Sequence, residues 1–213
     1  MKGVLFPGDR EVVIEEFDVP EPGAGQVLVR MKAAGICGSD LRYAYRVPKD
    51  RRAPLAGQIG GHEPCGVVAE IGEGVTSLAP GDRVVGYHIP GCGYCKYCRT
   101  GAAIHCANKT PEPERVAQEP QVGRSAFVDY HLFYERSCLL LPDEVSFVVG
   151  AMCACSSGTA FQAQRRLQLS GRDTLAVFGL GPLGLSAVLF GKALGARVVG
   201  IEPTAERRHL ARD

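Results

Sequence analysis

Four cysteines lie close together in the middle of the chain, and their spacing is typical of a metal site. Cys92, Cys95, Cys98 and Cys106 follow the pattern C-x2-C-x2-C-x7-C. Two-residue gaps let successive thiolates turn toward one centre, and a later cysteine can complete a tetrahedron around Zn²⁺. The set is closed, which predicts a structural zinc site. Disulfide-paired or redox-active cysteines and an iron–sulfur cluster are the alternatives.

Four thiolates around Zn²⁺ carry an excess of negative charge, which neighbouring groups must offset. Backbone N–H groups can point inward for this purpose. Nearby basic residues are Lys96, Arg99 and Lys109. The glycines that give the backbone room to bend are Gly91, Gly93 and Gly101.

A glycine-rich motif near the end of the chain predicts a dinucleotide site. Residues 179–184, Gly-Leu-Gly-Pro-Leu-Gly, fit G-x-G-x-x-G between an apolar strand and an expected helix. Gly179 permits the tight turn, Gly181 admits a pyrophosphate, and Gly184 lets helix and strand pack closely. Pro182 suits the first helical position. The backbone from Leu180 to Leu183 would then face the phosphates at the helix N-terminus.

An acidic residue follows at the end of the next expected strand. Glu202 lies 18 residues after Gly184. A carboxylate at this position accepts hydrogen bonds from the hydroxyls of the adenosine ribose and repels the 2′-phosphate of NADP. It therefore favours NAD over NADP. Arg207 and Arg208 would instead favour the phosphate, with Arg207 the first candidate for contact with the cofactor. The alternative is that Glu202 is a solvated carboxylate at the end of a strand and has no role in cofactor binding.

The elements that must carry these motifs fall into two patterns. The first 140 residues or so predict short strands at 11–17, 26–32, 64–72 and 83–87, at the roughly 10-residue spacing of a barrel or sandwich. Beyond Pro142, a helix in the second half of 145–169 leads to a strand at 174–178, a helix at 182–194, a strand at 197–201 and a helix opening at Thr204. This alternation begins a doubly wound parallel sheet.

The composition is that of a folded globular protein. Of 213 residues, 46% are hydrophobic and 22% charged, and the net charge of +1 gives no electrostatic reason to expect nucleic acid or a membrane as partner. The longest uncharged stretch, 145–164, contains several polar residues, so a buried segment is expected there and not a membrane span. No export signal is visible, so a reducing cytoplasm is expected, where the nine cysteines are metal ligands or core residues more readily than disulfides.

Taken together, the motifs resemble a zinc-dependent alcohol dehydrogenase of the medium-chain dehydrogenase/reductase superfamily. The matching segments are GICGSD (35–40), GGHE (60–63), GEGVTSLAPGDRVVG (72–86), GCGYCKYC (91–98) and GLGPLG (179–184). The resemblance implies an α/β protein, with a GroES-like β-barrel catalytic domain over 1–150 and the first part of a Rossmann domain over 151–213. It also implies reversible oxidation of a small-molecule alcohol or polyol to an aldehyde or ketone, with hydride transfer to NAD(P).

The resemblance assigns ligands to a second, catalytic zinc. Cys37 and His62 match the first two ligands. Cys155 is in register with the third, which leaves a fourth position for water or substrate; two cysteines and a histidine are the ligand set of alcohol dehydrogenases. Cys153, two residues away, is the competitor and is otherwise expected to be a buried small residue.

The resemblance also implies roles around the catalytic metal. Asp40 matches a carboxylate that holds the histidine ligand, and Glu63 matches one just behind the metal, with a helix N-cap or an arginine partner as its alternative. Ser39 matches the hydroxyl that contacts the substrate oxygen and passes its proton outward. Arg42 replaces a histidine that many relatives use next, and a guanidinium does not shuttle protons. The relay is thus expected to end at Ser39, water or ribose, and Arg42 could contact the cofactor or a polar substrate.

The length of the chain bears on activity. Two strands of a six-stranded sheet are visible, so roughly 100–120 further residues are expected in a complete member, which should be a dimer or tetramer. One alternative is therefore a truncated dehydrogenase remnant that binds zinc without turnover. Another is a zinc-ribbon binding module, which explains only the four-cysteine segment.

Overall fold

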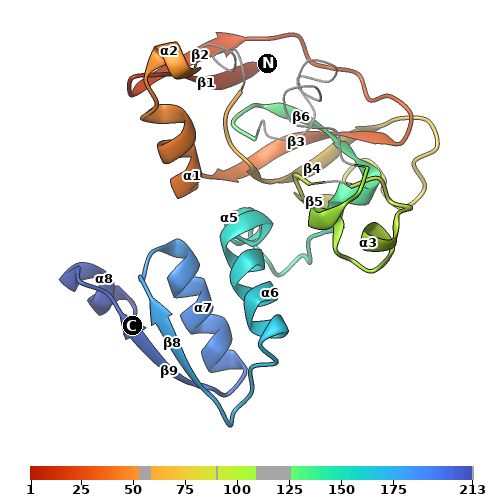
Figure 1. Ribbon diagram of the computed structural model, residues 1–213. Coiled ribbons are helices and arrows are strands. Elements are labelled where there is room, and N and C mark those ends of the chain that lie inside the picture. The colour runs from red at the N-terminus through yellow and green to blue at the C-terminus, as the bar shows by residue number, and fades with distance from the viewer. Residues whose placement is uncertain (53–58, 90, 109–125, 213) are drawn as a thin grey trace. The chain divides into compact units, whose positions relative to one another are not determined.

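The computed structural model describes residues 1–52, 59–89, 91–108 and 126–212 (Figure 1). Lys109 lies outside these residues. The chain divides into two compact units, Met1–Ala154 and Cys155–Asp213. The domain boundary predicted after residue 150 lies close to this division.

A five-stranded antiparallel sheet forms the centre of the first unit. Its strand order is β6-β3-β4-β5-β7. The strands are β3 (Gln26–Gly35), β4 (Glu63–Ile71), β5 (Arg83–Gly86), β6 (Tyr130–Tyr134) and β7 (Cys138–Leu140). A separate antiparallel pair consists of β1 (Lys2–Gly8) and β2 (Glu11–Glu16). Within the described residues no ladder joins the edge strands β6 and β7, so strand pairing leaves the expected barrel open there.

The core of the first unit combines side chains from four strands of this sheet with one from the loop before β5. β-Branched residues suit the pleated surface of a sheet, and the main cluster is Val27, Val29, Val68, Leu78, Val84 and Phe133. A turn after Leu78 leads into β5. The Asp82 carboxylate stabilises this turn by accepting a hydrogen bond from the Ala79 N–H at 2.8 Å. Gly81 supplies the positive φ of that turn, 99°.

Short helices connect the strands of the first unit. They are α1 (Gly38–Asp40), the π-helical turn η1 (Leu41–Tyr45), α2 (Lys49–Arg52), α3 (Lys96–Arg99), and the 3₁₀ turns η3 (Ala103–His105) and η4 (Glu135–Ser137). Strands 11–17, 26–32, 64–72 and 83–87 were expected and correspond to β2, β3, β4 and β5. β1, β6 and β7 were not expected, because β7 is only three residues long and Pro7 interrupts the pattern of β1.

A helical segment runs from the first unit into the second. α5 (Phe147–Met152) is followed by the π-helical turn η5 (Cys153–Ser157) and by α6 (Gly158–Arg166). The expectation placed helix only in the second half of 145–169. The first half is helical too, because the Ser146 hydroxyl caps α5 by accepting the Val149 N–H at 3.3 Å.

The same segment is less buried than expected. Val148 is 66% exposed, Val149 48% and Phe161 42%, so only one face packs against its own unit, as the helical repeat dictates. None of the described helices is long and apolar enough to cross a membrane.

The second unit contains two parallel strands and their helices. β8 (Thr174–Phe178) pairs with β9 (Arg197–Ile201), with α7 (Pro182–Ala193) between them in sequence and α8 (Ala205–Leu210) after them (Figure 1). α7 packs on one face of the pair, where Gly191 approaches Leu175 and Val198. These elements match the strand–helix alternation expected from the sequence.

Candidate metal centres and nucleotide turn

Residues from distant parts of the sequence form one group of metal-binding side chains. Cys37 follows β3 and begins α1, while His62 directly precedes Glu63, the first residue of β4. Because β3 and β4 pair antiparallel with Gly35 opposite Glu63, these segments lie side by side. Cys155 lies on the turn η5, which directly follows α5. One ligand atom from each of Cys37, His62, Glu63 and Cys155 lies within 4.8 Å of the others.

Asp40 contacts two members of this group at once. One carboxylate oxygen accepts the Cys37 backbone N–H at 2.8 Å, and the other lies 3.1 Å from His62 Nδ1. His62 and Asp40 are buried. A histidine that donates from Nδ1 keeps the lone pair of Nε2 for a metal. The position of Asp40 therefore fits the role that the resemblance implied.

Ser39 lies directly beside the same group. Its hydroxyl oxygen is 3.4 Å from His62 Nε2. Burial raises the pKa of the Cys37 thiol, but hydrogen bonds from the hydroxyl and backbone of Ser39 and the proximity of His62 outweigh burial. The net result is a lowered Cys37 pKa, and the thiolate is the form that binds a metal.

The turn η5 separates the two candidate cysteines. Cys155 is half-buried and belongs to the group, whereas Cys153 is exposed. The expectation that Cys153 is buried was wrong. Residues two apart on a helix point to opposite sides. Because the side that carries Cys155 is the more buried one, Cys153 points to the solvent.

Glu63, Arg42 and His88 differ in how far the sequence predicted their places. Glu63 opens a strand, which excludes the helix N-cap alternative, and it is 5% exposed. Arg42 lies on η1, exposed, with its guanidinium 5.4 Å from the Tyr43 ring centroid. His88 was not predicted. Its ring packs edge-on against His62 with centroids 5.2 Å apart, but no spacing motif marks it.

The four-cysteine segment has the dimensions of a single tetrahedral ion. Sulfur–sulfur distances are 3.9 Å for Cys92–Cys98, 3.6 Å for Cys95–Cys98 and 4.0 Å for Cys95–Cys106. Zn–S bonds of about 2.3 Å at tetrahedral angles separate sulfurs by about 3.8 Å. A disulfide requires about 2.05 Å, and all four cysteines are free. The residues therefore fit zinc, and the disulfide alternative does not hold for this arrangement.

Inward N–H groups surround these sulfurs, as the sequence predicted. The Cys95 N–H points to Cys92 Sγ and the Cys92 N–H to Cys106 Sγ, each at 3.3 Å. Asn108, which was not predicted, adds its backbone N–H to Cys106 Sγ at 3.3 Å and its side-chain amide to Cys92 Sγ at 3.4 Å. Lys96 instead places Nζ over the Tyr97 ring, 5.0 Å from its centroid.

The pKa values of Cys92 and Cys98 move in opposite directions. Desolvation raises the pKa of Cys92, but hydrogen bonds from Asn108 and from the backbone at Cys95 and Tyr94 lower it to about 6. Desolvation and its sulfur neighbours raise the pKa of Cys98 to about 11. The Cys92 thiol is therefore easier to deprotonate than the Cys98 thiol, and metal binding must displace the proton of Cys98.

The glycine-rich turn has the conformation that its motif requires. Gly179 has φ of +88°, which other residues rarely adopt. A β carbon on Gly184 would overlap the Gly179 carbonyl, whereas one on Gly181 would meet nothing within 4 Å. Gly181 thus has open space beside it, and Pro182 begins α7, where no N–H donor is needed. The Leu180 side chain is buried, while Leu183 is 49% exposed.

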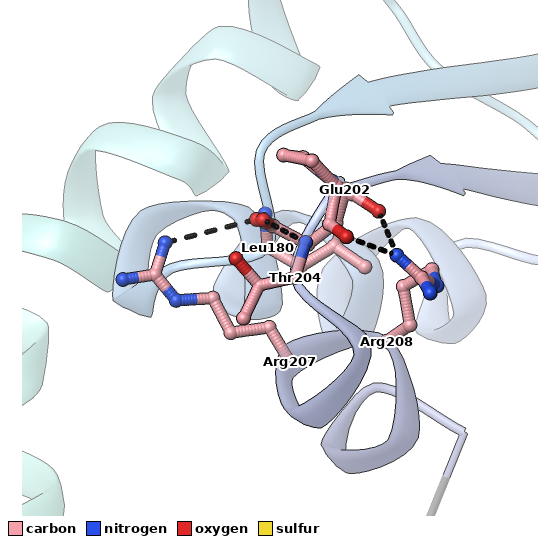
Figure 2. A network of polar contacts seen from close by, with 6 residues as sticks. Leu180, Glu202, Thr204, Arg207 and Arg208 are labelled. Carbon is pink, nitrogen blue, oxygen red and sulfur yellow. Dashed lines mark hydrogen bonds and ion pairs between the residues drawn. The ribbon is translucent and has the colours of Figure 1, made fainter.

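Glu202 connects this turn to the end of β9 (Figure 2). Its Oε2 accepts the Leu180 N–H at 2.8 Å, and its Oε1 accepts the Thr204 N–H at 3.0 Å. These two backbone bonds lower the pKa of Glu202 to about 2. Arg207 lies 3.7 Å from the same Oε2. Glu202 is 7% exposed, which does not fit the alternative of a solvated strand-end carboxylate.

Known proteins resemble this chain over its whole length. The chain is 40% identical to an uncharacterized zinc-type alcohol dehydrogenase-like protein, YphC of Escherichia coli K12, over all of this chain and 60% of that protein. The alcohol dehydrogenase TADH from Thermus sp. ATN1 has a TM-score of 0.86 at 31% identity, over 100% of this chain and 61% of that one. Acetophenone reductase from Geotrichum candidum, solved in complex with NAD, has a TM-score of 0.81 at 27% identity, over 99% and 60%.

The chain thus spans about 60% of the length of these relatives. The alcohol dehydrogenase GroES-like domain matches residues 23–143, which contain the four-cysteine segment and, of the other group, Cys37, His62 and Glu63. By this match and by its relatives, the chain belongs to the zinc-type alcohol dehydrogenases of the medium-chain dehydrogenase/reductase superfamily.

Proposed function

We propose that the full-length protein is a zinc-dependent oxidoreductase that reversibly oxidises an alcohol or polyol to an aldehyde or ketone, with NAD as the preferred hydride acceptor. The observation that carries this proposal is the presence of two different ligand sets. One has four cysteines and is closed. The other offers Cys37, His62 and Cys155 beside a buried carboxylate, and three such ligands leave a position for substrate.

The residues around Cys37 would prepare the site for catalysis. A zinc ion bound there would supply Lewis acidity, which makes the alcohol proton easier to remove. Asp40 fixes both the Cys37 loop and the His62 ring, so two ligands are oriented before any metal arrives. The Ser39 hydroxyl, 3.4 Å from His62 Nε2, would accept the alcohol proton and pass it on. With Arg42 unable to relay it, the proton would leave through water or the ribose.

The nucleotide turn supports a preference for NAD. Glu202 remains ionised, since its pKa is lowered to about 2 by backbone N–H bonds, and a carboxylate there repels a 2′-phosphate. The Arg208 guanidinium donates to backbone carbonyls, and Arg207 lies beside Glu202. Both arginines therefore have partners other than a phosphate. Gly181 leaves the space that a pyrophosphate needs.

The experiment that tests this function combines metal analysis with kinetics of the full-length protein. We expect about two zinc ions per chain and saturable, alcohol-dependent NADH formation in a panel of primary, secondary and polyhydric alcohols. Two zinc ions without turnover on any alcohol or carbonyl compound would favour the non-catalytic, zinc-binding alternative. A zinc content near zero in metal-replete protein would overturn both.

Location and assembly are part of the same proposal. All nine cysteines are free, which supports a reducing compartment, the cytoplasm. Exposed apolar side chains, Tyr94 at 71%, Leu139 at 64% and Leu140 at 63%, support a homo-oligomer, a dimer or tetramer. Light scattering of the full-length protein would test the assembly.

A further inference from the structure

Arg208 contacts the main chain at the nucleotide end of the second unit. It lies on α8, and its Nη1 donates to the backbone carbonyls of Glu202 at 2.7 Å and Pro203 at 2.6 Å (Figure 2). These carbonyls lie just before α8 begins, and Pro203 has no N–H of its own. The guanidinium therefore holds the main chain at the point where β9 ends.

The Glu202 carboxylate continues this connection toward the glycine-rich turn. Oε2 accepts the Leu180 N–H at 2.8 Å, and Oε1 accepts the Thr204 N–H at 3.0 Å. The carboxylate thus joins the end of β8 to the start of α8. Any shift of the Glu202 main chain would move the carboxylate and, with it, the Leu180 peptide that precedes Gly181.

The Arg208 guanidinium binds the main chain of its own protein, which is a structural contact and not a contact with a ligand. Its Nη1 donates hydrogen bonds to two backbone carbonyls. Hydrogen bonds from a charged donor are stronger than those from a neutral one. Glu202 is ionised near neutral pH because its backbone bonds hold its pKa near 2, so the connection through Leu180 persists across the physiological range. A substitution at Arg208 should therefore change the site through Glu202 and the turn.

We propose that Arg208 is a positioning residue for the dinucleotide: it holds the main chain of Glu202 so that the carboxylate fixes the Gly179–Gly184 turn for the pyrophosphate and ribose. This inference rests on the proposed function. It differs from the alternative in which Arg208 itself binds a 2′-phosphate.

The test uses the full-length protein and the variants Arg208→Met and Arg208→Lys, with Arg172→Met as the matched control. Arg172 lies before the first residue of β8, at the end of the strand away from the glycine-rich turn. Its replacement by Met changes the net charge by the same amount as Arg208→Met. The readouts are the Kd for NADH, NADPH and ADP-ribose by fluorescence or calorimetry, the KM for NAD and kcat, the Tm and the zinc content.

We expect Arg208→Met to raise the Kd for NADH and ADP-ribose and the KM for NAD about tenfold, the scale of one charge-assisted hydrogen bond. The kcat, Tm and zinc content should stay near those of the wild type. Arg208→Lys, which retains a cationic donor, should recover most of the affinity. Arg172→Met should bind NADH as the wild type does.

The other outcomes overturn the inference. Unchanged NADH binding in Arg208→Met would remove the positioning role. Failure of that variant to fold, or a loss of Tm in proportion to affinity, would show a role in stability alone. A loss of affinity confined to NADPH would identify Arg208 as a phosphate contact. If the wild type binds neither NADH nor NADPH, the proposed function fails, which is distinguishable from all of these results.

Discussion

Gly35 and Glu63 face each other across β3 and β4, and the glycine leaves the space that the carboxylate occupies. A β carbon at position 35 would overlap Glu63 Oε2 and lie 3.0 Å from its Cδ. Glu63 is buried and shares its group with Cys37 and His62. The absence of one methyl group on a strand therefore decides where a carboxylate stands beside the proposed catalytic metal.

Gly35→Ala should displace Glu63 and impair the catalytic site. We expect unfolding to become easier by about 1–3 kcal/mol, as for other overpacked positions, and kcat/KM to fall further than this loss of stability explains. Denaturant unfolding and steady-state kinetics would measure both. Gly38→Ala is the matched control for stability, because a β carbon there meets nothing within 4 Å. Wild-type activity in Gly35→Ala would show that the position of Glu63 is unimportant.

Cys95→Ser and Cys37→Ser should each remove about one zinc ion per chain, with different consequences. Cys95→Ser should also lower the Tm, because binding of a structural zinc contributes folding free energy. Cys37→Ser should keep the fold and lose turnover. Metal analysis alongside thermal unfolding distinguishes the two sites, and equal losses of Tm in both variants would contradict the division of roles.

Cys155→Ser should lose the catalytic zinc, whereas Cys153→Ser should keep it. The reason is that Cys155 belongs to the group with His62 while Cys153 is exposed. The two substitutions are chemically identical and two residues apart, so each is the control for the other in a zinc titration. The reverse result would mean that η5 presents the other cysteine to the metal.

Glu202→Ala should narrow the preference for NAD. Removing the carboxylate removes its repulsion of a 2′-phosphate, and we expect the ratio of kcat/KM for NAD over NADP to fall at least about tenfold. Affinity for NAD should fall as well, because Leu180 and Thr204 lose their acceptor. A wild-type protein that prefers NADP would contradict the role assigned to Glu202 and make Arg207 the candidate phosphate contact.

The contribution of Glu202 to stability should depend on pH in one direction. Its pKa is lowered in the fold, from 4.5 to about 2, so the ionised form is favoured in the folded state. The stabilisation is fully present above the ordinary pKa and disappears as the pH falls through the lowered one. The stability difference between wild type and Glu202→Gln should thus be constant above about pH 5 and shrink toward pH 2. A difference that grows in acid would contradict this direction.

Residue type and spacing alone predicted the four-cysteine cluster and the glycine-rich turn. Both are local, since Cys92 to Cys106 and Gly179 to Gly184 each lie within one short segment, and local backbone geometry brings such residues together. The strands β3, β4 and β5 and the elements β8, α7 and β9 were likewise predictable from periodicity and turn residues.

The tertiary structure decided the features that depend on contacts distant in sequence. Pairing of β3 with β4 places Glu63 opposite Gly35, and the turn η5 leaves Cys153 exposed. Neither follows from a motif, because strand pairing and helix rotation are set by what the rest of the chain buries. Glu202 shows the division most clearly: its position suggested a ribose contact, but only the fold brings its carboxylate to Leu180 and the Arg208 guanidinium to its carbonyl.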